Sequence, residues 1–234
     1  MAKPPARQVI WGLRILLFLP ACASACDPAL ARDSPSIVTE LAIVSDYRFR
    51  GISASERGPA IQANVEMASG DGLVVGVWAS SIADYHGSNI ELDFYSGFRS
   101  SIGETQITIL AYGFVYPGGD RVNTYDIEAS LTRMVGAATF DTLIALAPRQ
   151  RNAPRTNVYL SETVTLPLAP NRLALRLHYG WEEGMYDDKQ DWSVGLRYTK
   201  GKLEASLSYV DSDYQRHAGR NAAGSLVGAM KVRF

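Results

Sequence analysis

The most regular feature of this sequence is an alternation of apolar and polar side chains with a period of two residues. In the stretch 89–98, Ile90 and Phe94 fall on one face, and Glu91 and Asp93 fall on the other. The same alternation recurs in 124–131, 171–180, 191–199 and 202–210. A period of two is typical of β-strands with two unlike faces, whereas the 3.6-residue period of helices is nearly absent. The pattern therefore predicts an all-β fold.

Twelve segments have the character of strands. They span about 36–45, 59–69, 72–82, 89–101, 105–116, 122–133, 137–147, 155–166, 171–181, 190–199, 202–211 and 222–234. Most are as long as the roughly 9–11 residues with which a tilted strand crosses a bilayer. Strands of ordinary globular proteins average about 5–6 residues. The segment lengths favour strands that span a membrane.

The connections between these segments alternate between two kinds. One set is tight and comprises 69–72, 101–104, 134–137, 166–171 and 199–202. The other set is mostly longer and more polar, and comprises 46–58, 83–88, 117–121, 148–154, 182–189 and 212–221. Short periplasmic turns alternating with longer outer loops are typical of bacterial outer-membrane barrels. We therefore predict an up-and-down antiparallel transmembrane β-barrel of twelve strands.

A soluble, secreted β-sandwich is the alternative, because its strands also alternate. Sandwich strands are usually shorter, and nothing requires their loops to alternate in length. A closed barrel also leaves no free sheet edge, so it needs no disulfide to hold one.

The first residues differ in character from the rest. A basic start is followed by the apolar run "ILLFLPACASA" (15–25), which ends in small residues. This layout is that of a secretory signal peptide, too short to span a membrane as a helix. Cleavage after Ala23, Ala25 or Ala31 would each fit an A-x-A pattern. We expect residues 1–31 to be a leader and residues 32–234 to be one barrel domain.

Both cysteines, Cys22 and Cys26, fall in this leader. The sequence "LPAC" also resembles a lipoprotein box, which leaves lipidation of Cys22 as an alternative. The mature chain is then free of cysteine, although an exported protein enters an oxidising compartment where disulfides form.

The sequence stops on Phe234, within the last alternating segment. An apolar, alternating last strand that ends in Phe resembles the signal read by the barrel-assembly machinery, which we expect to be a partner. Aromatic residues are expected at both membrane interfaces of a barrel. One such girdle would include Tyr47, Tyr116, Tyr125, Trp181, Trp192 and Tyr209, and the other Phe98, Phe140 and Phe234.

Charge and hydropathy narrow the choice of partners. The formal net charge is −1 at pH 7, so the chain has no overall attraction to nucleic acid. Its mean hydropathy of −0.06 argues against a helical membrane protein. The expected surroundings are outer-membrane lipid and small polar solutes.

An ordered set of short motifs resembles the TorF porin family. The motifs are "SDYRFRGIS" (45–53), "PAIQANVEMA" (59–68), "GLVVGVWASSI" (72–82), "IELDFYSGF" (90–98), "YGFVYPGG" (112–119) and "DWSVGLRYT" (191–199). The resemblance covers nearly the whole mature chain and is densest in 45–119. It implies an outer-membrane barrel that acts as a porin, and it supports the fold more than any particular solute.

Charged side chains on the polar faces are the candidates for selectivity, because lumen-facing charges filter solutes in a pore. The acidic set is Glu91, Asp93, Asp126 and Glu128, and the basic set is Arg172, Arg176 and Arg197. A basic residue facing lipid costs about 2–4 kcal/mol near the midplane, so these side chains are expected in the lumen. There they either create a transverse field across an open pore or pair with each other and stabilise a polar interior.

The motif "SDYRFRG" lies where the first strand meets a long connection. Asp46 and Arg50 are expected to pair there, with Arg48 nearby. The connection could fold into the mouth and place Asp46 and Arg50 near a constriction. Alternatively, the pair only anchors the loop.

An enzyme would need a nucleophile, a base and an orienting group close together. The three histidines, His86, His178 and His217, are not part of a recognisable nucleophile motif. No metal-ligand cluster and no phosphate-binding glycine loop appears, so we predict no cofactor and no catalysis. The sequence favours a porin-like channel for passive diffusion of small polar solutes or ions. A non-conducting structural or adhesive barrel is the alternative, and a barrel hydrolase is less favoured.

Overall fold

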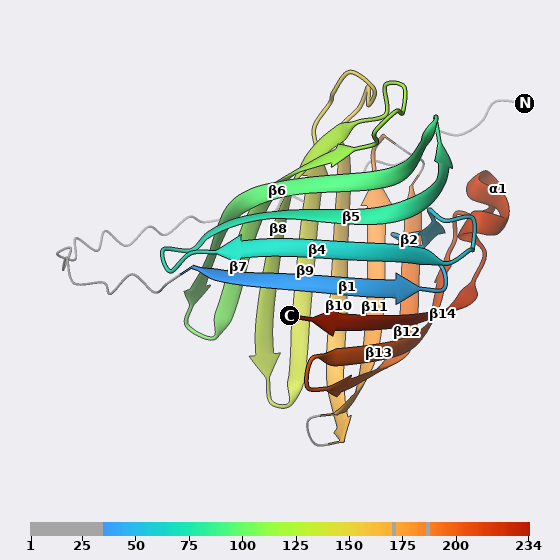
Figure 1. The fold of residues 1–234 in the computed structure, drawn as a ribbon. Helices are drawn as coiled ribbons and strands as arrows, with labels where there is room; N and C mark the ends of the chain where they lie inside the picture. The colour runs from blue at the N-terminus through green and yellow to red at the C-terminus, as the bar shows by residue number, and fades with distance from the viewer. Residues whose placement is uncertain (1–34, 170–171, 186–187) are drawn as a thin grey trace, which may run out of the picture. The chain divides into compact units, whose positions relative to one another are not determined.

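The computed structural model describes residues 35–169, 172–185 and 188–234, and twelve strands of this part form a closed barrel (Figure 1). The predicted leader, residues 1–31, lies outside the described residues. The barrel strands are β1 (Ser36–Val44), β4 (Ala60–Ala68), β5 (Leu73–Tyr85), β6 (Ser88–Ile102), β7 (Thr105–Val115), β8 (Thr124–Val135), β9 (Ala138–Ala147), β10 (Asn157–Ala169), β11 (Leu173–Glu183), β12 (Lys189–Lys200), β13 (Leu203–Ser212) and β14 (Ser225–Arg233).

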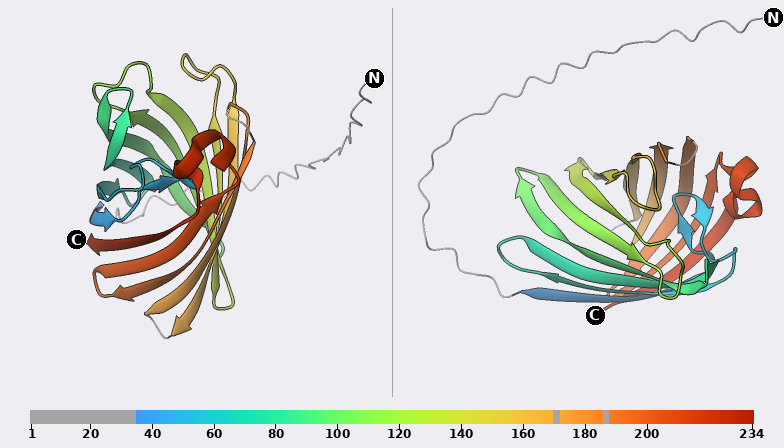
Figure 2. Two further views of the ribbon diagram at one scale, coloured as in Figure 1. Left: turned by 90° about the vertical axis from the view of Figure 1, so that its right-hand side faces the viewer. Right: turned by 90° about the horizontal axis from the view of Figure 1, so that it is seen from above.

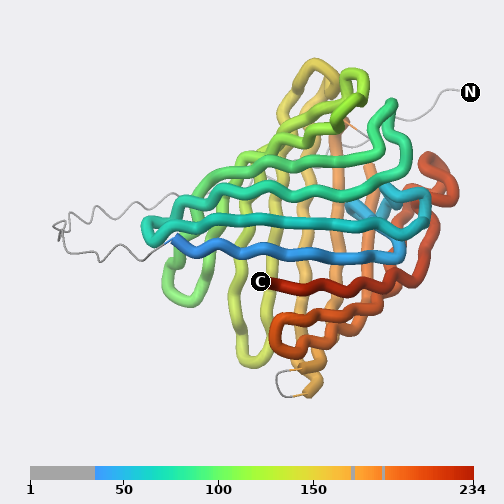
Figure 3. Tube along the Cα trace, viewed as in Figure 1, coloured from blue at the N-terminus to red at the C-terminus, as the bar shows by residue number. Residues whose placement is uncertain are grey.

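Each strand pairs antiparallel with its neighbours in the chain, and β1 closes the ring against β14 (Figure 3). Leu41 faces Val232 across this closing seam. The N–H of Phe234, one residue beyond β14, donates to the carbonyl of Thr39 over 2.8 Å. The predicted twelve-stranded, up-and-down barrel is confirmed, with strand ends within a few residues of those expected from the alternation.

The two faces of the barrel wall have the opposite character to those of a soluble protein. On β6, Phe94 and Phe98 point outward and are 52% and 63% exposed. Glu91 and Asp93 point inward and are 5% and 8% exposed. An apolar outer surface around a polar interior suits a wall surrounded by lipid.

The aromatic girdles are found in part. Tyr125, Trp181, Trp192 and Tyr209 are exposed near one end of the barrel, and Phe98 and Phe234 near the other. Tyr47 was expected in the first girdle, but it is buried and its ring packs against Trp78, with centroids 5.4 Å apart. Tyr116 also departs from the prediction, because it turns inward and donates a hydrogen bond to Glu91.

One end of the barrel, here the turn end, has connections of two to four residues, and the other end, the loop end, has mostly longer ones. The connection at 83–88 is an exception to the prediction of a long loop. Strands β5 and β6 continue to a Tyr85–Ser88 pair, and His86 and Gly87 form a tight turn. Both residues have positive φ angles, 53° and 98°, as hairpin turns of this length require.

The connection after β1 folds into the barrel rather than over it. This inward segment, residues 45–58, contains a small hairpin of β2 (Arg48–Phe49) and β3 (Ile52–Ser53), which lies within the ring of strands (Figure 2). Two short helices, α1 (Gln215–Ala218) and η1 (Gly219–Ala222), precede β14 at the loop end. No helix in the described part of the chain is long and apolar enough to cross a membrane.

Candidate functional site in the barrel lumen

The inward segment divides the lumen into two cavities. The inner cavity has a volume of about 730 Å³ and is lined by nearly every strand of the ring. The outer vestibule, toward the loop end, has a volume of about 450 Å³. Phe49 and Arg50 line both cavities, so this pair of side chains forms the partition between them.

Asp46 anchors the inward segment. Its buried carboxylate accepts hydrogen bonds from Arg48 Nε at 2.7 Å, Ser53 Oγ at 2.6 Å, Ser225 Oγ at 3.3 Å and Ser55 Oγ at 3.4 Å. Three of these donors belong to the segment itself, and Ser225 belongs to β14. The carboxylate therefore holds the segment in its folded form and attaches it to the wall.

Arg50 lies in a cage of carboxylates and aromatic rings. Its guanidinium is 2.7 Å from a carboxylate oxygen of Glu182, 3.7 Å from Asp126 and 3.9 Å from Glu128. Its Cζ atom lies 4.2 Å from the ring centroid of Tyr159 and 4.7 Å from that of Phe49. The cage thus combines ion pairing with cation–π contact.

The predicted Asp46–Arg50 pair is wrong, since Asp46 pairs with Arg48 and Arg50 pairs with the barrel wall. The reason is the turn of the small hairpin, where Arg50 and Gly51 have φ angles of 47° and 82°. This turn directs Arg50 away from Asp46. A Cβ at Gly51 would lie 2.7 Å from that of Asp191, so the position needs glycine for both space and conformation.

The four predicted acidic residues lie close together. Glu91 and Asp126 line the vestibule and Glu128 lines the inner cavity, whereas Asp93 lines neither. Glu91 accepts a hydrogen bond from the Tyr116 hydroxyl over 2.7 Å. Burial, with the nearby Glu91 charge, raises the pKa of the Tyr116 phenol, so Tyr116 remains a donor. Asp93 and Asp126 are buried, and within the described part of the chain each keeps one carboxylate oxygen without a hydrogen-bond partner.

The predicted basic residues lie apart from the acidic ones. Arg176 lines the inner cavity, and Arg197 is close to it on the neighbouring strand, with Arg176 facing Gly195 in the register. Neither arginine has an ion pair within 4.0 Å among the described residues. The predicted strand position of Arg172 is wrong: β11 begins at Leu173, so Arg172 lies exposed in the turn before it. The acidic cluster is therefore compensated by Arg50, not by these wall arginines.

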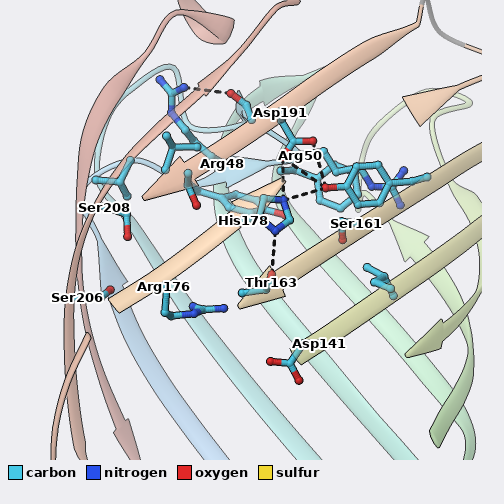
Figure 4. Close-up of a pocket in the computed structure, with 18 of the residues that line it drawn as sticks. Arg48, Arg50, Asp141, Ser161, Thr163, Arg176, His178, Asp191, Ser206 and Ser208 are labelled. Atoms are coloured by element: carbon cyan, nitrogen blue, oxygen red, sulfur yellow. Dashed lines mark hydrogen bonds and ion pairs between the residues drawn. The ribbon is translucent and has the colours of Figure 1, made fainter. Parts of the chain in front are cut away.

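A hydrogen-bonded group around His178 is the part of the site that the sequence did not reveal. His178 Nε2 lies 3.0 Å from Asp191 Oδ1, and its Nδ1 lies 2.9 Å from Thr163 Oγ1. The Tyr159 hydroxyl donates to Asp191 over 3.1 Å. Figure 4 shows His178 between Asp191 and Thr163, with Arg176 farther along the wall. The alternation along each strand predicts that these side chains point inward, but it does not predict that they contact each other across three strands.

Aromatic side chains fill the lumen along β5 to β7. The Tyr95 and Tyr112 rings stack with centroids 5.2 Å apart, and Phe114 continues the stack at 5.9 Å from Tyr112. Tyr95 also packs with Val74 and Leu110 in the main buried apolar cluster. The open space of the inner cavity therefore lies along the opposite, hydroxyl-rich wall.

The sequence pattern of a bacterial family described as "Bacterial protein of unknown function (Gcw_chp)" matches residues 29–233. No curated protein sequence matches the chain.

Solved structures with the same architecture include two porins. The chain aligns with a structure described as "KdgM porin" at a TM-score of 0.59 and 6% identity, covering 84% of this chain and 98% of that one. It aligns with "NanC porin structure in rhombohedral crystal form" at a TM-score of 0.57 and 9% identity, covering 85% and 99%. These similarities show a shared outer-membrane barrel fold.

Proposed function

The chain belongs to the Gcw_chp family of bacterial proteins of unknown function, and we propose that it is a porin-like channel that passes small polar solutes or ions across the outer membrane by diffusion. The main observation in support of this proposal is the inner cavity of about 730 Å³, which is lined by inward-facing polar side chains of a closed twelve-stranded ring. The porin descriptions of the fold neighbours and the resemblance of the motifs to the TorF family support the same function.

The proposed path runs from the loop end to the turn end. A solute enters the outer vestibule, passes the Phe49–Arg50 partition and reaches the inner cavity. Hydroxyl groups along the inner wall replace part of its hydration shell. The lining hydroxyl residues are Ser130, Thr132, Ser161, Thr163, Ser193, Ser206 and Ser208. Long loops face outward in barrels of this class, so the vestibule is the extracellular side of the proposed channel.

Charge orders the proposed path in two zones. The vestibule is lined by the carboxylates of Glu91, Asp126 and Glu182 together with Lys189, and the inner cavity is lined by Arg176 together with Asp141 and Asp191. Rings and clusters of fixed charge select ions by sign. A cation therefore meets its favourable region first, and an anion meets an unfavourable one first.

Liposome swelling tests the proposal. Proteoliposomes loaded with an impermeant polysaccharide are diluted into iso-osmotic arabinose, glucose or sucrose, and light scattering reports solute entry. We expect swelling that slows steeply as solute size rises, with protein-free liposomes as the baseline. Folded barrel, identified by a mobility change on boiling before a detergent gel, that gives no swelling with any solute would favour a closed structural or adhesive barrel.

A hydrolase is the second candidate, because Thr163, His178 and Asp191 are aligned as a hydroxyl, a base and an orienting carboxylate. The backbone N–H groups of these strands pair in the sheet, so a side chain such as Arg176, which lines the same cavity, would have to supply the electrophilic group. Turnover of p-nitrophenyl esters that is abolished by Thr163→Val and His178→Gln would favour this candidate. Swelling without such turnover would favour the channel.

A further inference from the structure

We propose that the partition is a binding site for small organic cations that carry a guanidinium or a primary amine, and that Arg50 occupies this site as a tethered competitor. The inference deepens the proposed channel function, since it names the class of solute that the constriction recognises. It rests on the cage around Arg50, on the charge that remains there and on a buried carboxylate oxygen that has no hydrogen-bond partner among the described residues.

The site remains negative even with Arg50 in place. Four carboxylates, those of Glu91, Asp126, Glu128 and Glu182, line the two cavities at the partition. Arg50 and Lys189 supply two positive charges, and Lys189 is paired with Glu182. A cation that enters from the vestibule therefore meets a field that one tethered arginine does not neutralise.

One of these carboxylates, that of Asp126, has unused hydrogen-bonding capacity. Asp126 is 5% exposed and lines the vestibule, and its Oδ1 atom has no hydrogen-bond partner among the described residues. Buried polar atoms are almost always hydrogen-bonded. The Asp126 carboxylate lies beside the Arg50 guanidinium, so its Oδ1 atom is an acceptor for the N–H groups of a cationic solute that takes the place of Arg50.

The shape of the cage fits a planar organic cation better than a bare metal ion. The carboxylates are spread around the guanidinium, and within the described residues no three His, Cys, Asp or Glu side chains are arranged to hold a metal. The Tyr159 and Phe49 rings present faces to the Arg50 guanidinium at 4.2 and 4.7 Å. Aromatic faces combined with carboxylates are the recognition pattern for ammonium and guanidinium groups.

The test uses arginine amide as the probe. The full chain is expressed with its leader, purified in detergent, and titrated with arginine amide by calorimetry at low ionic strength, with glucose as an uncharged control. A group tethered near a site competes at an effective concentration in the millimolar range. We therefore expect Arg50→Ala to bind arginine amide on the order of tenfold more tightly than the wild type. The matched control is Arg121→Ala, which removes an exposed arginine at the same end and is expected to bind as the wild type does.

Equal affinity of Arg50→Ala and the wild type, or no binding by either, would overturn the proposal. If Arg50→Ala does not fold, as judged by the boiling shift, Asp126→Asn supplies the test. This substitution keeps the size of the side chain and removes a negative charge 3.7 Å from the Arg50 guanidinium. It is expected to weaken arginine amide binding at least about threefold. Unchanged affinity in Asp126→Asn would count against the proposal.

The binding test separates this inference from the channel function. A barrel that binds arginine amide as expected but swells with no solute would refute the channel alone. A barrel that admits solutes while neither variant changes the binding of arginine amide would refute the cation site alone.

Discussion

Replacing Asp46 by alanine should release the inward segment from the lumen. The buried carboxylate holds Arg48, Ser53, Ser55 and Ser225, with its two shortest contacts at 2.6 and 2.7 Å. In the described part of the chain no other carboxylate lies within 4.0 Å of the Arg48 guanidinium, and the side chain of Arg48 is 3% exposed. The substitution therefore leaves a buried cation without its counter-ion.

The size of the effect follows from this geometry. Removing one partner of a buried ion pair costs about 3–5 kcal/mol. Since about 1.4 kcal/mol corresponds to a factor of ten, the released form should gain on the order of 10²–10⁴ in population relative to the folded form. The backbone pairing that closes the barrel does not depend on these side-chain contacts, so we expect the barrel to remain closed.

Limited proteolysis measures this release. Trypsin can cut after Arg48, Arg50 and Arg57, but the first two side chains are buried in the folded segment. When opening is fast, cleavage follows the population of the open form. Cleavage of Asp46→Ala within 45–58 should therefore be at least about a hundredfold faster than in the wild type. Asp120→Ala, which changes an exposed carboxylate at the same end, is the control. Equal cleavage rates in Asp46→Ala and the wild type, with both barrels folded, would refute the anchoring role of Asp46.

Three further predictions address the walls of the barrel. Gly76→Ala should lower the free energy of unfolding in urea by about 1–3 kcal/mol, because the Cβ of the alanine would overlap the Tyr95 ring. An unchanged midpoint of urea unfolding would contradict this close packing. Glu162 lies on the outward face with Leu160 and accepts a hydrogen bond from Thr142. Glu162→Leu should therefore raise the free energy of unfolding in lipid vesicles by about 1–2 kcal/mol. A lower free energy of unfolding in Glu162→Leu would indicate that Glu162 does not face lipid. Glu91→Gln combined with Asp93→Asn should move the reversal potential in a potassium chloride gradient toward that of chloride; an unchanged potential would exclude these residues from the filter.

The alternation of side chains was sufficient to predict the barrel because lipid and lumen make opposite demands on the two faces of each strand. A charged side chain such as that of Asp93 or Glu128 would destabilise the barrel if it faced lipid, so it points inward. Side chains alternate along a strand, so the residues on either side of it must point outward. Segments that are apolar on both faces did not reveal their direction. The stretch 106–116 is of this kind, and its inward residues Tyr112 and Phe114 join the aromatic stack that narrows the lumen.

The site was predictable in its residues but not in its contacts. Arg50 was identified as a constriction candidate, yet its partner Glu182 lies 132 residues away along the chain, and no local pattern connects the two. The nearby Asp46 was the expected partner, but the backbone turn at Arg50 and Gly51 excludes it. The group around His178 arises from the register of three strands, which the alternation alone does not determine.

Single-channel recording in a planar bilayer tests the central claim most directly. The purified full chain is added to one side of the bilayer under a potassium chloride gradient, and current is recorded at fixed voltages. The channel proposal predicts discrete conductance steps whose reversal potential indicates a preference for potassium, because the carboxylates at the partition outnumber its cations. A protein with the boiling shift of a folded barrel that gives no steps at any voltage would contradict the proposal and indicate a lumen closed by the inward segment.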